Sequence, residues 1–314
     1  PSPRSWSSPM AKWLLIGDPH AVVDELDDMK ALIDGIVATV KAEKPQYVLF
    51  MGDQHHNHAI MHVEVMAFWR EAFTRLGQLD THVLALVGNH DMPGDSSTKS
   101  HAMMAYEGIP GLQVVDQLMT VDGCLLIPYR HSGPDFINDV ASTPNAKTVF
   151  CHQTFDGSKY ENGFYAKDGI DISGFADRQF ISGHIHTPQR FANVMYIGAP
   201  RWRSLSDVGV ERRLFLLDIG GTAPAKTFDT AQWCQKLLRV EDRQEAPLEL
   251  EVHPKWKSLG CRGRTFKTQS ASKQVSESMG IHKAIQVFMD TYVPKYGTDV
   301  AVLRTMVNQR LSNS

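Results

Sequence analysis

Acidic residues, histidines and one asparagine recur directly after apolar runs along this chain. The segments are Asp18-Pro19-His20, Gly52-Asp53, Gly88-Asn89-His90-Asp91, the isolated His152, and Gly183-His184-Ile185-His186. Carboxylate, imidazole and amide oxygen groups bind hard to borderline divalent cations. A strand that ends in a loop presents such groups at the edge of a sheet. The series therefore predicts a site for divalent metal ions.

If these residues bind two neighbouring ions, the site is suited to hydrolysing phosphoesters. Ions about 3.5–4 Å apart lower the pKa of a bridging water and neutralise charge on the phosphoryl oxygens. Such a site needs one carboxylate that reaches both ions, and Asp53, which follows a glycine at the end of an apolar run, is the expected bridge. The other ligands would divide between the ions: Asp18, His20 and His186 for one, and Asn89, His152 and His184 for the other. Any one of these residues taken singly could instead cap a helix or form a turn.

The order D-x-H, G-D, G-N-H-D, a lone histidine and G-H-x-H resembles the calcineurin-like metallophosphoesterases, over residues 13 to about 190. This resemblance implies the ligand assignment given above and attack by a metal-bound hydroxide. It further implies that His90 is a histidine outside the ligand set, which stabilises the phosphoryl oxygens or protonates the leaving group. Asp91 would orient His90. The resemblance thus implies a metal-dependent phosphoesterase with His90 and Asp91 as catalytic residues.

A narrower resemblance links the chain to the SbcD-type nucleases of DNA recombination and repair. It rests on residues 196–201 and 212–218, which look like the strand pair after G-H-x-H in that branch, and on residues 123–129. Mixed oxygen and imidazole ligands favour two manganese ions, with iron, zinc or magnesium as alternatives. The resemblance implies a DNA exonuclease, with endonuclease activity as an addition. It also implies an SbcC-type ATPase partner that docks on the C-terminal helices. The chain departs from the branch in having Gln54-His55-His56-Asn57-His58 where a second acidic residue often follows the bridging aspartate.

Several residues are candidates for substrate contact. His55 and His56 could line the substrate entrance or be solvated loop residues. Trp202, between Arg201 and Arg203, could stack on a base or anchor a loop to the core. The basic and aromatic stretch 255–267 could contact phosphates or be a solvated strand edge.

Alternating strand-like and helix-like patterns must position these residues. Apolar runs predict strands at 13–17, 47–51, 82–87, 112–115, 124–128, 148–151, 179–182, 194–197 and 213–219. Helical spacing of apolar residues fills 23–40 and 65–76, and a short helix is expected to end near Gly108. We expect an α/β fold: a two-sheet β-sandwich flanked by helices, with a small C-terminal α+β appendage that ends in a helical hairpin.

The chain divides by character into three parts. Residues 1–9 are expected to be a cloning remnant before a native start at Met10. Residues 10–221 would form the metallophosphoesterase catalytic domain, which holds 12 of the 14 histidines. Residues 222–314 would form an accessory region for capping, DNA or partner binding, and its apolar helices could instead pack on their own domain. A homodimer is a further expectation for the chain.

Composition narrows the remaining options. The 314 residues are 42% hydrophobic and 21% charged, which is ordinary for a globular protein, and the net charge of −3 does not favour DNA binding by bulk charge. The four cysteines lack C-x-x-C spacing, and no apolar run spans a membrane, so we expect a cytoplasmic protein without membrane contact. A phosphodiesterase or phosphatase acting on a small molecule or a protein, and a non-catalytic scaffold of the same fold, stay open as alternatives.

Overall fold

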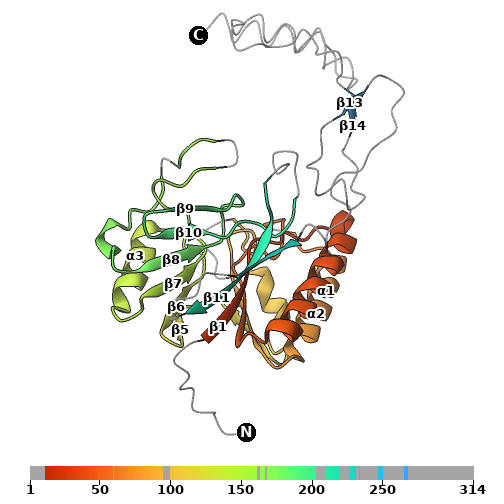
Figure 1. Ribbon diagram of the computed structural model, residues 1–314, viewed down its shortest axis with the longest axis horizontal. Coiled ribbons are helices and arrows are strands. Elements are labelled where there is room, and N and C mark those ends of the chain that lie inside the picture. Colours follow the sequence, from red (N-terminus) through yellow and green to blue (C-terminus); the bar gives the residue numbers. More distant parts are fainter. Residues whose placement is uncertain are drawn as a thin grey trace, which may run out of the picture. The chain divides into compact units, whose positions relative to one another are not determined.

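The computed structural model describes residues 11–58, 60–94, 100–160, 163–166, 168–202, 210–219, 226–230 and 233, and the strand backbone at 247–249 and 265–267. Within these residues, two six-stranded sheets carry the fold (Figure 1). The expected N-terminal remnant, the C-terminal helical hairpin, Arg203 and most of the basic stretch 255–267 lie outside the described residues.

The first sheet has the order β12-β11-β1-β2-β3-β4. Strands β1 to β4 run parallel, while β11 is antiparallel to β1 and β12 is antiparallel to β11. Their bounds are Ala11–Ile16 (β1), Tyr47–Phe50 (β2), His82–Leu86 (β3), Leu112–Val115 (β4), Arg213–Ile219 (β11) and Lys226–Asp229 (β12). β12 extends this sheet past residue 221, the expected end of the catalytic domain.

The second sheet has the order β5-β6-β7-β8-β10-β9, with β6, β7, β8 and β10 parallel and an antiparallel strand at each edge. Its strands are Met119–Val121 (β5), Cys124–Ile127 (β6), Thr148–Cys151 (β7), Gln179–Ser182 (β8), Gln189–Phe191 (β9) and Val194–Tyr196 (β10). In a parallel sheet the carboxyl ends of the strands share one edge, so loops that follow them meet there.

Helices cover the outer faces of both sheets. α1 (Leu26–Glu43) and α2 (Val63–Gly77) lie against the first sheet, and α3 (Gly133–Ser142) lies against the second (Figure 1). Three short 3-10 helices, Val23–Glu25, Ala102–Tyr106 and Ser173–Phe175, complete the helical elements in these ranges. The expectation from sequence missed α3, although Ser132 accepts a hydrogen bond from the Asp135 amide at 3.3 Å as its N-cap, and Pro134 lies in its first turn.

The alternation of side chains along the strands explains the layers. In β1, Trp13 and Leu15 point into a core shared by both sheets, where Phe150 and Ile181 meet them. Leu14 and Ile16 of the same strand point to the other face and pack under α1 and α2. Two buried faces need continuous apolar strands, which is why these runs do not alternate. The expected two-sheet sandwich flanked by helices is thereby confirmed.

A second compact unit follows along the chain. In it β13 (Pro247–Glu249) pairs antiparallel with β14 (Thr265–Lys267). The domain boundary at residue 221 stays a prediction. Across the described ranges, every helix is too short or too polar to cross a membrane.

Candidate metal centre

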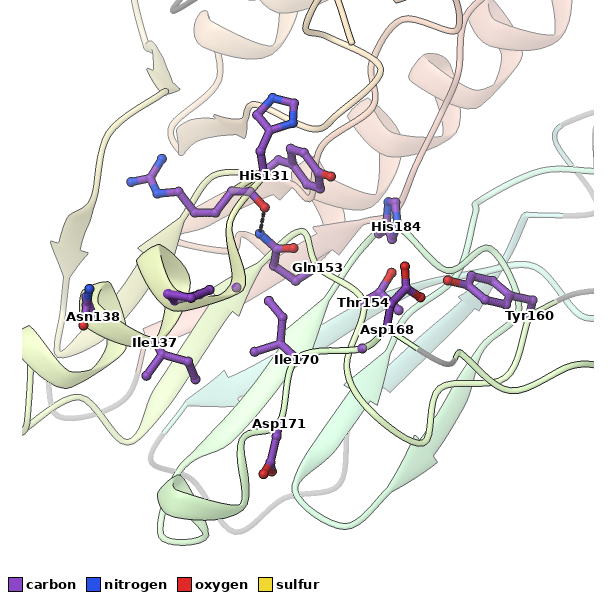
Figure 2. A pocket seen from close by; sticks show the side chains of 15 residues that line it. His131, Ile137, Asn138, Gln153, Thr154, Tyr160, Asp168, Ile170, Asp171 and His184 are labelled. Atoms are coloured by element: carbon purple, nitrogen blue, oxygen red, sulfur yellow. Dashed lines mark hydrogen bonds between the residues drawn. The ribbon is translucent and has the colours of Figure 1, made fainter. Parts of the chain in front are cut away.

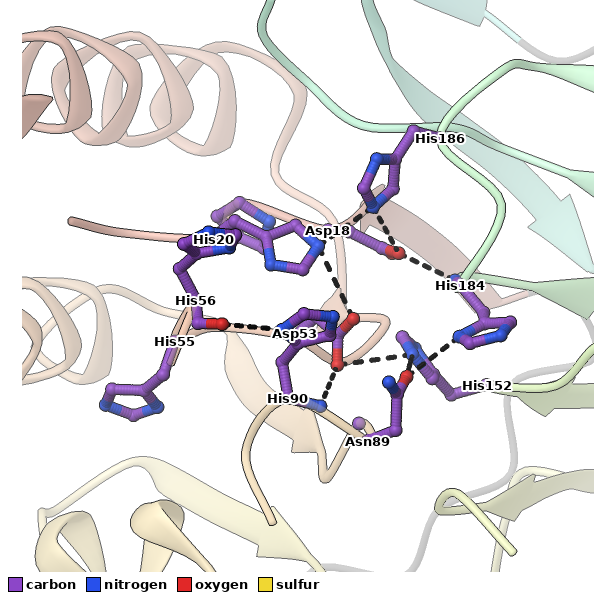
Figure 3. A network of polar contacts seen from close by, with 12 residues as sticks. Asp18, His20, Asp53, His55, His56, Asn89, His90, His152, His184 and His186 are labelled. Carbon is purple, nitrogen blue, oxygen red and sulfur yellow. Dashed lines mark hydrogen bonds and ion pairs between the residues drawn. The ribbon is translucent and has the colours of Figure 1, made fainter. Parts of the chain in front are cut away.

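The carboxyl ends of the central strands bring the predicted ligands together. His184, just after β8, lies at the edge of a cavity of about 730 Å³ (Figure 2). Four other loops meet near His184: those after β1, β2 and β3 of the first sheet and the one after β7 of the second (Figure 3). They carry, in chain order, Asp18, His20, Asp53, Asn89, His90 and His152. Both sheets therefore contribute to one site at their shared edge.

Potential ligands form three groups within this site: two match the predicted sets, and the third joins His20 to His56 and His90. Asp18, His20 and His186 have ligand atoms within 4.8 Å of one another, and Asp53, His152 and His184 form a second such group. The amide oxygen of Asn89 lies 2.9 Å from His152 Nε2 and 2.8 Å from His184 Nδ1, so it joins the second group. The structure thus assembles all seven residues into the two predicted sets.

Asp53 lies between the two groups. Its Oδ2 is 3.4 Å from His20 Nε2, while its Oδ1 is 3.3 Å from His152 Nε2 (Figure 3). The side chain is 1% exposed, and the His90 amide donates a 2.8 Å hydrogen bond to Oδ1. One carboxylate thus presents a separate oxygen to each group, which is the geometry of a bridging ligand.

The nitrogen and oxygen atoms that face each other at this site are better suited to binding cations than to contacting one another. His20 Nε2 and His186 Nε2 face each other at 2.9 Å, so one ring must carry its proton on Nε2 and donate it to the other. The Oδ1 of Asp18 is buried and has no hydrogen-bond partner among the residues that the structure describes. Buried polar atoms of this kind are costly unless something compensates them. Divalent cations would satisfy both positions, and these residues therefore fit the metals that the motifs predict.

Electrostatics at the site follow from burial and from close charges. Burial raises the pKa of Asp18 to about 6, and the charge of Asp53 adds to this rise. Burial also acts to raise the pKa of Asp53, but the charge and hydrogen bond of His152 hold it well below its usual range. Burial disfavours charge on His152, yet Asp53 and Asp18 outweigh it and raise the pKa of His152 to about 9. A proton on His152 thus partly neutralises the negative charges of Asp53 and Asp18, which a divalent cation would neutralise more completely.

His184 and His90 behave in the opposite way. Burial and the nearby His152 lower the pKa of His184 to about 3, so its ring is neutral and able to bind a metal at neutral pH. Burial likewise lowers the pKa of His90. Both rings are therefore neutral at pH 7.

The backbone at the site is strained. His20, Asp53 and His184 have φ angles of 46°, 54° and 77°, in the left-handed region that residues with a Cβ rarely adopt. Such strain persists only where surrounding contacts enforce it, and it clusters at functional sites. The site is also tightly packed, because a Cβ on Gly88 would lie 2.2 Å from Asp53 Oδ1. Three of the predicted ligands are thus held in place at a cost of local strain.

Asp91 contacts other groups than His90, which corrects the role expected for it. Its carboxylate accepts hydrogen bonds from the amides of Gln54, His55 and Gly88 at 3.3, 3.0 and 3.0 Å. These bonds join the loop after β2 to the loop after β3. His90 is oriented by His56 instead, because His90 Nδ1 donates to the His56 carbonyl oxygen at 2.6 Å (Figure 3). Asp91 therefore positions the loops and does not orient the His90 ring.

Three expected substrate contacts, His55, Trp202 and Arg201, are buried. His55 is 3% exposed, and its ring lies between Asp91 at 2.8 Å and the Tyr106 hydroxyl at 2.8 Å, so it faces the interior and not the substrate entrance. Trp202 is 2% exposed in the core under α1 and α2, where its indole donates to the Val210 carbonyl at 2.6 Å. It anchors its loop and cannot stack on a base. His56 lies partly exposed beside the metal-binding loops, as expected for a residue near the entrance.

Arg201 holds a metal-binding loop. It is 1% exposed and donates to the carbonyl oxygens of Pro19 and His20 at 3.1 and 2.9 Å, while its Nη1 forms an ion pair with Glu25 at 2.7 Å. Its burial explains why it cannot contact substrate. Arg212, which sequence reasoning left without a role at the site, is also buried and donates to the His186 carbonyl. The arginines that follow G-H-x-H thus fix the loops bearing the first group of ligands.

Comparison with known proteins agrees with this geometry. The sequence profile of the calcineurin-like phosphoesterases matches residues 11–188. Exonuclease subunit 1 of Enterobacteria phage T4 is 28% identical over 229 residues, which cover 66% of this chain and 64% of the relative. Protein 078R of Invertebrate iridescent virus 3, named as a presumed phosphoesterase, is 27% identical over 197 residues, covering 56% and 53% respectively. The chain thus spans less than two thirds of the length of either relative.

Among solved structures, protein TT1561 of Thermus thermophilus is 11% identical with a TM-score of 0.43, covering 70% of this chain and 99% of that one. A similarity of this size carries no information on activity. The profile, in contrast, matches more than half of the chain and includes all five motifs. The chain belongs to the calcineurin-like phosphoesterase family.

Proposed function

We propose that the chain is a two-metal phosphodiester hydrolase and that its substrate is DNA. The position of Asp53 carries the first part of the proposal, since one buried carboxylate faces two ligand groups with separate oxygens. The two cations would lower the pKa of a shared water and neutralise charge that develops on the phosphoryl oxygens. Asp18, His20 and His186 would hold one of them, and Asn89, His152 and His184 the other, with Asp53 shared.

The chain's own groups prepare the site for a phosphodiester. His90 is held by two contacts, its amide on Asp53 Oδ1 and its Nδ1 on the His56 carbonyl. Because a carbonyl oxygen only accepts, Nδ1 carries the proton and Nε2 is the nitrogen that can exchange a proton with substrate. We assign to His90 the role of steadying a phosphoryl oxygen or passing a proton to the leaving oxygen; for either role Nε2 must first take up a proton, because Nδ1 holds the one proton of the neutral ring.

DNA as substrate and manganese as metal are the finer parts of the proposal. The relative named exonuclease subunit 1 supports a nuclease, and the sequence resemblance to SbcD-type nucleases points the same way. Mixed oxygen and imidazole ligands suit manganese and would also accept iron, zinc or magnesium. An ATPase partner, a homodimer and a cytoplasmic location are further proposals. The helices expected to receive the partner lie outside the described residues.

The rival activity is hydrolysis of a small-molecule or protein phosphoester, since the same ligands serve both. The two proposals separate in one assay. The full chain with Mn²⁺ is incubated with end-labelled linear DNA, with bis(p-nitrophenyl) phosphate and with p-nitrophenyl phosphate. We expect shortened DNA fragments and turnover of the diester, with far less turnover of the monoester.

Two substitutions provide the controls. Asp53→Asn should abolish hydrolysis of both diesters, whereas Asp34→Asn, at an exposed ion pair on α1, should leave it unchanged. If every DNA substrate stays intact while the monoester is hydrolysed, the nuclease proposal is wrong. If the chain binds less than one equivalent of metal and hydrolyses nothing, the non-catalytic scaffold is correct.

A further inference from the structure

The cavity beside His184 adjoins the metal centre but contains no residue that the proposed hydrolysis uses, apart from His184 itself. It has a volume of about 730 Å³, within the usual range for small-ligand sites. Its lining comes from the loop after β6, from α3, and from the segment between β7 and β8 (Figure 2). A group attached to a phosphate at the metals would extend into this space.

The cavity has aromatic walls. Tyr129 lies next to the metal ligands, with its ring centroid 6.0 Å from that of His184 and 6.2 Å from that of His152. Tyr160 lines the cavity too and is 37% exposed. Ile137 and Ile170 add apolar surface (Figure 2). These walls suit a flat ring with polar edges.

The charges of the cavity disfavour a second phosphate there. Asp168 and Asp171 contribute carboxylates to the lining. Arg130, the one permanent cation among the described lining residues, already pairs with Asp139 through a 2.7 Å contact from Nε to Oδ2. Carboxylates repel phosphates but accept hydrogen bonds from the amino groups of bases. The occupant should therefore be an uncharged ring with N–H donors, which every base carries.

Exposed aromatic side chains also lie on the segment that carries Tyr160. Among the described residues, the exposed Phe, Tyr and Trp side chains are Tyr160, Phe164 and Tyr165, at 37%, 72% and 65%. All three lie on one turn, which is held by hydrogen bonds between Tyr160 and Phe164 at 2.8 Å and between Ala166 and Ser158 at 2.8 Å. Exposed apolar side chains that gather in one place are typical of a binding surface. We name Tyr160, Phe164 and Tyr165 the aromatic turn.

We propose that the cavity receives the nucleoside attached to the phosphate being hydrolysed, and that the aromatic turn stacks on the following bases of the same single strand. Stacking suits this role because every base has a π face, so binding would tolerate any sequence. Bases in a duplex are already stacked on one another and are less available. This inference rests on the proposed function, because the nucleoside is placed by its phosphate.

Binding tests the proposal without turnover. In an Asp53→Asn chain, which should not cleave, fluorescence anisotropy measures the affinity for fluorescein-labelled dT12 and for a blunt 12-base-pair duplex. Adding Tyr160→Ala, or Phe164→Ala with Tyr165→Ala, should weaken dT12 binding roughly tenfold. Duplex binding should change less. Val63→Ala, a control at a 69% exposed apolar residue on α2, should stay within about twofold.

The outcomes separate this inference from the proposed function. If Tyr160→Ala and the double variant bind dT12 as the Val63→Ala control does, the nucleoside site is wrong, even if the parent chain hydrolyses bis(p-nitrophenyl) phosphate. If dT12 binding depends on the aromatic turn but the parent chain hydrolyses no diester, the nucleoside site stands and the hydrolase proposal fails. Equal weakening for dT12 and the duplex would overturn the preference for single strands.

Discussion

Replacing Asp91 tests whether this carboxylate holds two metal-binding loops together. It accepts main-chain hydrogen bonds from Gln54 and His55 after β2 and from Gly88 after β3, and it is 1% exposed. Asp53 lies on the first of these loops and His90 on the second. In Asp91→Ala, all three amides lose their acceptor inside the protein, where water cannot easily replace it.

The size of the effect follows from these three bonds. A buried donor left without an acceptor costs about 1–3 kcal/mol, so Asp91→Ala should lower the free energy of unfolding by at least about 3 kcal/mol. For a domain of this size, each kcal/mol shifts Tm by about 2–4 °C, which gives a fall of roughly 6 °C or more. Asp91→Asn keeps one acceptor oxygen and should fall between Asp91→Ala and the parent chain.

Differential scanning calorimetry measures Tm, and elemental analysis measures bound metal. Asp34→Ala is the matched control: it removes an exposed carboxylate, 2.6 Å from Arg75, whose ion pair is worth only about 0–1 kcal/mol. We expect Asp91→Ala to lose both stability and metal. A Tm within about 2 °C of the control, together with a large loss of turnover and full metal content, would refute this reasoning and restore the orienting role for Asp91.

Three further predictions concern the metals. Gly88→Ala should reduce bound manganese below two equivalents by elemental analysis, because its Cβ would meet Asp53 Oδ1 at 2.2 Å; Gly174→Ala, whose Cβ would lie in open space, should not. Manganese affinity by isothermal titration calorimetry should fall as the pH drops through about 9, where the pKa of His152 lies, and should fall further below about 6, where the pKa of Asp18 lies, because the cation must displace each proton. An affinity that stays unchanged from alkaline to acidic pH would contradict this. Adding manganese at about 100 times its Kd to the chelator-treated chain should raise stability by about 2.7 kcal/mol per independent site, seen as a higher Tm; an unchanged Tm would argue against a site formed only in the folded chain.

The sequence predicts phosphoester hydrolysis and the grouping of the candidate metal ligands. Asp18, Asp53 and Asn89 each follow a short apolar run, and such runs become parallel strands whose carboxyl ends share an edge. This local pattern predicts the strands, the two-sheet class and the grouping of the metal ligands. It does so because strand formation and ligand chemistry depend on neighbouring residues.

Tertiary structure alone decided what the supporting residues do. His55 and Arg201 have the composition of substrate contacts, but folding buries both, Arg201 against carbonyls more than 180 residues away in the chain. Asp91 follows His90 directly, yet its carboxylate accepts hydrogen bonds from the loop after β2. The cavity likewise joins Tyr129, Tyr160 and His184 from separate loops. Such contacts arise from how two sheets pack, and no local pattern of residues specifies them.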